Sequence, residues 1–239
     1  MTKLLLFKNI IFLLFSFCIL IFSCENKKVL KKKKEDICVC LQPFENFDTL
    51  YITHIKKEIK NQYQFKSIVL PPKPLPKNAY TLNIKGLLKY NPQPYARYRA
   101  DSLLYFLLKS KPVNCDYILG LTAQDISTTN KENKKIKEPA YLHCDWGIFG
   151  LGFLGGNSCV VSSFRLSFGT FDKNIISKRV AKTTTHEIGH NLGLDHCLTP
   201  LCNMNAAPTY NALGANDQRN QSVCKKCKEK LKITKTKND

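Results

Sequence analysis

Metal-binding side chains are concentrated near the carboxyl end of the chain, in KTTTHEIGHNLGLDHCLTPLCNM, residues 182–204. His186 and His190 are four residues apart, so on a helix they share one face and both imidazoles can reach a single ion. Glu187 lies beside them, where its carboxylate can hold a water molecule against the metal. This arrangement predicts a hydrolytic zinc site with Glu187 as the general base.

A third ligand must come from beyond the helix. Gly193 can adopt the left-handed conformation that ends a helix, and His196 follows three residues later. His196 can therefore return to the same ion. Three histidines leave a fourth coordination position open for water, as in catalytic rather than structural zinc sites. Stray histidines, or a site that binds zinc without doing chemistry, are the alternatives; binding alone would not need Glu187.

Four cysteines after this motif form two pairs. Cys197 and Cys202 are separated by four residues, and Cys224 and Cys227 form a C-x-x-C. Two such pairs can build a tetrahedral four-thiolate zinc site. The sequence therefore predicts a second, structural zinc ion, giving two per chain, joined to the first at the His196–Cys197 peptide. Two disulfides are the alternative, which an oxidising compartment would permit.

The combined pattern H-E-x-x-H-x-x-G-x-x-H-C-x4-C-x-M…C-x-x-C resembles the archaemetzincin family of metalloproteases. Three earlier stretches are also similar to that family: YNPQPYARYRADSLLYFLL, CDYILGLTAQDI and FGLGFLGGNSCVVSSFRL. The resemblance covers residues 65–227. It implies a compact metzincin-like zincin domain of the α/β (α+β) class, with a twisted mixed sheet, an active-site helix and an irregular C-terminal part stapled by zinc. It also implies that Met204 forms the Met-turn below the catalytic zinc.

The function implied is hydrolysis of peptide bonds by a zinc-dependent metallopeptidase. We expect a peptide or protein substrate to lie extended along an edge strand near residues 148–164, paired through backbone hydrogen bonds. The glycine-rich run 147–156 is either a rim that lets this backbone approach or an ordinary loop. We expect a monomer. The alternatives are a catalytically inactive zinc-binding lipoprotein and a basic binding module.

Regular elements are needed to position these residues. The apolar spacing predicts a helix over 47–63, a short strand within 65–76, a helix over 95–112, a buried strand and polar turn over 115–128, a bulged and then a regular strand within 148–168, and the motif helix over 176–192. Asp48 is a plausible cap for the first helix, and Leu50 is predicted to face its core. Strands that alternate with helices indicate a mixed α/β domain.

The amino terminus reads as a targeting segment. Lysines precede an apolar run of thirteen residues, 10–22, which suits a signal peptide and is short for a membrane span of about 20 residues. Ser23-Cys24 resembles a bacterial lipobox. We therefore expect a lipoprotein-type signal peptide over 1–23, a lipid anchor on Cys24, and an exported protein attached to a membrane of a bacterial envelope. An uncleaved signal anchor is the alternative, favoured by lysines at 27, 28 and 31–34.

A lysine-rich stretch over 24–43 predicts a solvated, charged tether, which leaves 44–239 as the catalytic domain. Lys and Arg outnumber Asp and Glu by 37 to 18, a net charge of +19 that favours anionic partners. The excess is mostly lysine, scattered or clustered at the chain ends, and the cysteines lack interleaved aromatic and basic residues. No nucleic-acid partner is therefore expected.

Five further cysteines are left without an assigned role: Cys38, Cys40, Cys115, Cys144 and Cys159. In an exported protein, Cys144 and Cys159 are candidates for a disulfide near the cleft. A thiolate of Cys38 or Cys40 that caps the catalytic zinc in a latent form is a further hypothesis.

Overall fold

The computed structural model describes residues 33–82, 96–130, 145–206, 217 and 222–233. The chain divides into residues 1–32 and 33–239, and all described residues belong to the second unit. The predicted signal peptide and Cys24 therefore lie outside the described residues. Among the described helices, none combines the length and the apolar character that crossing a bilayer requires.

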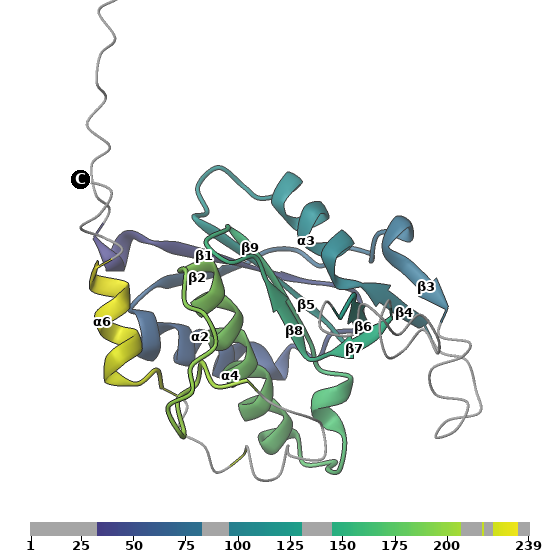
Figure 1. Ribbon diagram of the computed structural model, residues 1–239. Coiled ribbons are helices and arrows are strands. Elements are labelled where there is room, and N and C mark those ends of the chain that lie inside the picture. Colours follow the sequence, from purple (N-terminus) through teal and green to yellow (C-terminus); the bar gives the residue numbers. More distant parts are fainter. Residues whose placement is uncertain (1–32, 83–95, 131–144, 207–216, 218–221, 234–239) are drawn as a thin grey trace, which may run out of the picture. The chain divides into compact units, whose positions relative to one another are not determined.

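A five-stranded sheet forms the centre of the domain (Figure 1). Its strands are β1 (Cys38–Pro43), β2 (Lys66–Val69), β5 (Tyr117–Thr122), β8 (Gly150–Gly152) and β9 (Ser158–Ser162), in the order β2-β1-β5-β9-β8. The first four strands in this order are parallel, and β8 pairs antiparallel with β9. The strand β8 is therefore an edge of the sheet.

A second sheet has four strands: β3 (Tyr80–Leu82), β4 (Ala96–Arg99), β6 (Asp125–Thr128) and β7 (Trp146–Ile148), in the order β3-β4-β6-β7. Two of its charged side chains, Arg97 and Asp125, are deeply buried but paired. The Asp125 carboxylate accepts from Arg97 Nε at 2.7 Å and from Arg165 Nε at 2.6 Å. Arg165 belongs to a 3-10 turn, η4 (Arg165–Ser167), that follows β9 of the first sheet. This ion pair offsets the cost of burying the charges and links the two sheets.

Helices cover both faces of the five-stranded sheet (Figure 1). These are α2 (Leu50–Tyr63), α3 (Ala100–Lys109) and α4 (Lys173–Asn191). A further helix, α6 (Lys225–Ile233), begins directly after Cys224 and contains Cys227, and two short 3-10 turns are η1 (Lys34–Asp36) and η2 (Lys77–Ala79). Because strand side chains alternate between faces, Leu41, Leu119 and Val161 pack with α2 and α4. Ile118 and Val160 pack on the opposite face with α3.

The structure corrects several sequence predictions. Residues 38–43 are not part of a tether: they form β1, because CVCLQP is apolar enough to be buried between β2 and β5. Residues 96–99 are a strand rather than the start of the helix that follows, and 125–128 are a strand rather than a polar turn. In α2, Tyr51 and Tyr63 join Ile55 and Ile59 in the core, whereas Leu50 is exposed.

Candidate metal centre

The helix α4 carries the motif and ends at the position that the motif requires. Its first turn is capped by Asp172, whose side chain accepts from Asn174 N at 2.8 Å. At the other end, Gly193 has a φ of +84°. Gly193 N donates to His190 O at 2.9 Å, and Leu194 N donates to Gly189 O at 2.9 Å, which is the Schellman pattern of a helix end. The chain therefore turns back here, as predicted.

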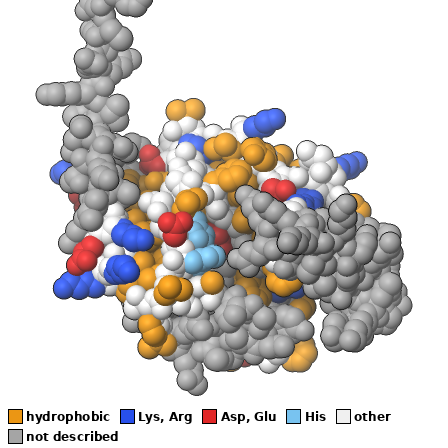
Figure 2. All heavy atoms as spheres, viewed as in Figure 1, with side chains coloured by type: hydrophobic (Ala, Val, Ile, Leu, Met, Phe, Trp, Pro, Cys, Tyr) orange, Lys and Arg blue, Asp and Glu red, His pale blue; other side chains and the backbone are white. Residues whose placement is uncertain are grey.

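The three histidines of the motif converge. One ring nitrogen from each of His186, His190 and His196 lies within 4.8 Å of those of the other two. The first two rings are partly buried and His196 is exposed. Figure 2 shows histidine side chains at the surface of one face, next to acidic and hydrophobic side chains. The sequence-predicted ligand set is thus brought together at a site that solvent can reach.

The hydrogen bonds of the first two histidines fix the orientation of their rings. His186 Nδ1 lies 2.7 Å from Asn203 O, and His190 Nδ1 lies 2.7 Å from Leu194 O. A carbonyl oxygen only accepts, so both Nδ1 atoms carry a proton and both neutral rings present the Nε2 lone pair. Burial lowers the pKa of His186 to about 3, which keeps that ring neutral.

The two Nε2 atoms then face each other at 3.1 Å. Two lone pairs at this distance repel unless a cation lies between them. Nitrogens bound to a tetrahedral zinc ion at about 2.0–2.1 Å are about 3.3–3.4 Å apart. The donor set and its spacing therefore fit a zinc ion.

Glu187 lies between α4 and the edge strand β8 and is only 6% exposed. Burial raises the pKa of its carboxyl to about 8, and a hydrogen bond with the Gly152 backbone opposes this shift. A Cβ atom on Gly150 would lie 2.7 Å from Glu187 Oε1, and one on Gly152 would lie 2.6 Å from Glu187 O. The glycines of β8 therefore admit the helix that carries Glu187, which is a role that the sequence analysis did not assign to them.

Met204 is fully buried next to the motif helix. A Cβ atom on Gly189 would overlap Met204 Sδ and lie 3.0 Å from Tyr63 Oη. The lack of a side chain at Gly189 thus lets the methionine pack against α4. Met204 O also accepts from Cys197 N at 2.8 Å, which ties this turn to the segment after His196.

Two residues that the sequence analysis missed support the histidines. Asn203 contributes the carbonyl that orients His186, and its side-chain amide donates to Thr185 Oγ1 at 2.9 Å. Tyr63 donates its hydroxyl to Thr185 O at 2.6 Å and so joins α2 to α4. Neither had a signal in the sequence, because Asn203 acts through its backbone and Tyr63 is distant in the chain.

The four cysteines after the motif also converge. Cys197 Sγ lies 3.8 Å from Cys224 Sγ, and Cys202 Sγ lies 3.9 Å from Cys227 Sγ. All four sulfurs are within 4.8 Å of one another and none is in a disulfide. Sulfurs bound to a tetrahedral zinc ion at about 2.3 Å are about 3.8 Å apart.

Hydrogen bonds from the backbone favour the thiolate form of Cys197 and Cys202, whereas burial raises the pKa of Cys202 and Cys227. Hydrogen bonds from Thr199 lower the pKa of the Cys197 thiol, and Thr199 N lies 3.4 Å from Cys197 Sγ. Cys224 N donates to Cys202 Sγ at 3.3 Å. A deprotonated sulfur is the form that binds a metal, so these contacts suit a metal site better than the two disulfides considered as the alternative.

The remaining cysteines contradict the idea of a latency switch. Cys40 is disulfide-bonded to Cys115, and the Cys38 sulfur lies next to both rather than at the histidine cluster. Cys159 is a buried thiol packed below Glu187 rather than a disulfide partner. Cys144 lies outside the described residues.

Fold and site together define a zincin-like α/β protein with two candidate metal clusters. A sequence model described as peptidase family M54 matches residues 49–233. The chain belongs to this family. This match confirms the resemblance to archaemetzincins that the sequence indicated. The likeness to a solved archaemetzincin structure confirms the expected metzincin-like, mixed α/β fold.

Individual archaemetzincins show the extent of this similarity. The protein from Haloarcula marismortui is 40% identical over 91 residues, which are 35% of this chain and 51% of that relative. The chain thus spans about half of that relative's length. The protein from Methanocaldococcus jannaschii is 28% identical over 197 residues, 81% of this chain and 92% of the relative. The crystal structure of the archaemetzincin from Methanopyrus kandleri has the same fold, with a TM-score of 0.64 and 23% identity, covering 87% of this chain and 99% of that one.

Proposed function

We propose that this protein is a zinc-dependent metallopeptidase that hydrolyses peptide bonds. The observation that carries the proposal is the pair of Nε2 lone pairs, on His186 and His190, that face each other at 3.1 Å with His196 beside them. This set binds one ion and leaves a coordination position for water, while the buried carboxyl of Glu187 lies on the same helix turn. Membership of a peptidase family supports the same conclusion.

The chain's own residues divide the chemistry as follows. His186, His190 and His196 hold the ion; when bound, zinc supplies a Lewis acid that acidifies water and polarises the scissile carbonyl. Glu187 accepts a proton from the attacking water and passes it to the leaving amine, so that the carboxylate is regenerated. Burial raises the pKa of the Glu187 carboxyl and so its affinity for that proton; a zinc ion held by the three histidines would oppose this shift and favour the ionised carboxylate.

The substrate is a peptide or protein, bound as an extended strand along β8. This strand is the edge of the five-stranded sheet and lies directly against α4. An edge strand offers backbone N–H and C=O groups to a peptide that adds to the sheet. We also propose that the protein acts as a monomer, which light scattering of the purified protein would test.

The second zinc ion of the proposal is bound by Cys197, Cys202, Cys224 and Cys227. It is structural, because four thiolates fill its coordination sphere and leave no position for water. Two zinc ions per chain, falling to one in His186→Ala, is the result that elemental analysis should give. A chain with one ion, whose four cysteines do not react with thiol reagents when denatured without reductant, would show disulfides instead.

The test of the catalytic proposal is Glu187→Gln. The amide keeps the size of the side chain but cannot accept a proton, so zinc content and fold should be retained while kcat on a cleaved peptide falls roughly 10²–10⁴-fold. The matched control is Glu229→Gln, which makes the same change at an exposed position of α6. Wild-type turnover by Glu187→Gln would contradict the assignment of the base. A zinc-loaded wild-type protein that cleaves nothing in a peptide library would support the inactive, zinc-binding alternative.

The proposed location is a bacterial envelope, through acylation of Cys24 after cleavage of residues 1–23. The short apolar run that ends in Ser23-Cys24 motivates this proposal. Mass spectrometry of protein from the membrane fraction should find an acylated amino-terminal cysteine, and Cys24→Ala should remain unprocessed. A mature protein that still begins at Met1 would instead support the signal-anchor alternative.

A further inference from the structure

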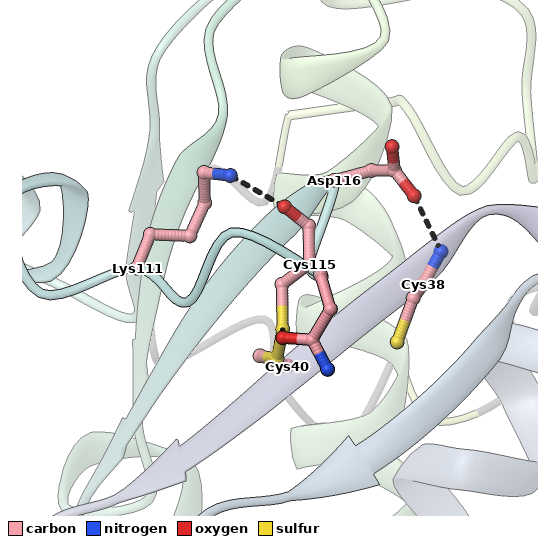
Figure 3. The surroundings of a disulfide bond; sticks show 6 residues. Cys38, Cys40, Lys111, Cys115 and Asp116 are labelled. Atoms are coloured by element: carbon pink, nitrogen blue, oxygen red, sulfur yellow. Dashed lines mark hydrogen bonds between the residues drawn. A yellow bond between two sulfur atoms is a disulfide. The ribbon is translucent and has the colours of Figure 1, made fainter.

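A third group of sulfurs lies at the amino ends of two paired strands, separate in the sequence from both clusters described above. Cys38 and Cys40 are two residues apart in β1, so their side chains leave the same face of the strand. Cys115 lies two residues before β5, and the parallel register of Val39 with Tyr117 places the segment before β5 at the amino end of β1. All three sulfurs are within 4.8 Å of one another (Figure 3).

Two of these sulfurs are bonded to each other. Cys40 and Cys115 form a disulfide whose Cα atoms are 5.8 Å apart. A disulfide needs two sulfurs only, and it does not explain why the side chain of Cys38 joins it on the same face. A set of three converging sulfurs is what a thiolate metal site requires.

The surroundings of this three-cysteine cluster suit thiolates that open toward solvent on one side. Cys40 and Cys115 are 0% and 2% exposed, whereas Cys38 is half-buried. The ammonium group of Lys111 donates to Cys115 O at the edge of the cluster, as Figure 3 shows. The Asp116 carboxylate accepts from Cys38 N at 2.8 Å and fixes the amino end of β1.

We propose that Cys38, Cys40 and Cys115 form a further metal site, for a thiophilic ion such as Zn²⁺, whenever the Cys40–Cys115 disulfide is reduced. Three thiolates would hold the ion, and its remaining position opens toward solvent beside Cys38. Soft thiolate ligands select zinc and cuprous ions over magnesium or calcium. Neither the peptidase chemistry nor the four-cysteine cluster requires this site.

The two states exclude each other because they use the same sulfurs. A dithiol reductant breaks the Cys40–Cys115 bond by exchange; it gives two electrons and two protons to these sulfurs and becomes a cyclic disulfide. Metal binding then displaces the thiol protons. Loss of two electrons to an oxidised dithiol reverses the sequence and releases the ion. In either state, the amino end of β1 stays attached to the segment that precedes β5.

The experiment counts metal ions in wild type and Cys38→Ser under two redox conditions. Each protein is incubated with Zn²⁺ and a dithiol without oxygen, freed of excess metal, and measured by elemental analysis. Reduced wild type should carry one more zinc per chain than reduced Cys38→Ser. Air-oxidised wild type should lose this ion. The matched control Cys159→Ala removes a buried cysteine outside the cluster and should keep the extra ion.

A second probe identifies the ligands. Titration of the reduced protein with Cd²⁺ should give thiolate-to-metal charge-transfer absorption. This absorption should be smaller in Cys38→Ser than in Cys159→Ala, by the amount that one three-thiolate site contributes. Equal zinc content in reduced wild type and Cys38→Ser would overturn the proposal. Should Cys38→Ser not fold, the wild type alone decides, because zinc content that does not change with oxidation of Cys40 and Cys115 overturns the proposal too.

Discussion

The histidine cluster and the four-cysteine cluster adjoin at the His196–Cys197 peptide, but they are built in opposite ways. Two of the three histidines are on α4, a helix packed against β8, β9 and α2. Their rings are oriented by backbone carbonyls at 2.7 Å. Cys197, Cys202 and Cys224 lie outside the described helices and strands, whereas Cys227 lies in the short helix α6.

The two regions also differ in the extent of the apolar packing around them. Around the motif helix, buried side chains from β1, α2, β5, β9, η4 and α4 form one core. Around the cysteines, the small apolar cluster consists of Leu194, Met204 and Val223 together with the cysteines themselves. We therefore expect the fold to position the histidines before metal arrives, and the cysteine region to depend on a bound metal ion for its folding. Structural zinc contributes about 10–16 kcal/mol of apparent free energy in small zinc-binding peptides.

The largest effect should follow from Cys224→Ser, which removes one thiolate from the region that depends on metal. We expect the second zinc ion to be lost and the segment 197–233 to become sensitive to protease. Because Cys197 N also donates to Met204 O, this loss should loosen His196 and weaken zinc binding at the histidine cluster roughly 10–100-fold. Competition with a chromogenic chelator measures that affinity.

Lys226→Ser is the matched control, since it introduces the same residue at an exposed position between the two cysteines of the pair. It should keep both ions and resist protease as wild type does. If Cys224→Ser left the affinity of the histidine cluster for zinc unchanged, zinc binding at the histidines would not depend on the cysteine region, and this prediction would be wrong.

An intermediate effect is expected from Gly189→Ala, at the contact where the two regions meet. The added methyl group would overlap Met204 Sδ and approach Tyr63 Oη, and overpacking of this kind costs about 1–3 kcal/mol. The higher helix propensity of alanine returns up to about 1 kcal/mol. Urea unfolding should therefore show a net loss of stability of about 1–2 kcal/mol, accompanied by weaker zinc binding at the histidine cluster.

A double-mutant cycle gives the control for this prediction. Met204→Ala makes room for the methyl group, so Gly189→Ala should cost less stability in that background than in wild type. A stabilising effect of Gly189→Ala in wild type would show that the methionine does not pack closely on the helix. An equal loss of stability in both backgrounds would show that the added methyl group is strained by contacts other than the one with Met204.

The sequence predicted which residues come together in the two clusters, because the spacing within each motif is local. The four-residue step from His186 to His190 and the helix end at Gly193 are properties of one helix, and the structure has both. The spacing of Cys224 and Cys227 is also local, although the sequence analysis did not predict the helix α6 that contains Cys227. The positions of these residues followed from the pattern, although the identity and number of bound ions stay proposals.

Non-local features escaped the sequence analysis. The strand β1 was hidden by the preceding run of lysines, because burial of residues 38–43 depends on pairing with β2 and β5. The strand at 96–99 continues directly into α3, so no turn residue separates the two elements. The disulfide partner of Cys40 is 75 residues away, and no spacing rule identifies it.

The smallest effect is expected at the amino end of α4, remote in the sequence from both clusters. Lys173 Nζ lies 2.9 Å from the Asp48 carboxylate, which also accepts from Leu50 N at the start of α2. The hydrogen bond from Lys173 lowers the pKa of Asp48 below its ordinary value of 3.8. The native state therefore binds this proton less readily than the unfolded chain, so the stabilisation is present at neutral pH and is lost as the pH falls through and below 3.8.

Because this pair is largely solvent-exposed, Lys173→Met should lower the thermal midpoint by only about 2 °C at pH 7. The difference from wild type should shrink as the pH falls below 3.8 and disappear once Asp48 is protonated in both states. Lys178→Met, at an exposed lysine of the same helix, should show no such pH dependence. Zinc affinity at both clusters should stay at the wild-type value. A loss of zinc in Lys173→Met would mean that the histidines depend on the whole helix rather than on its last turns and the contacts of Gly189, Asn203 and Leu194.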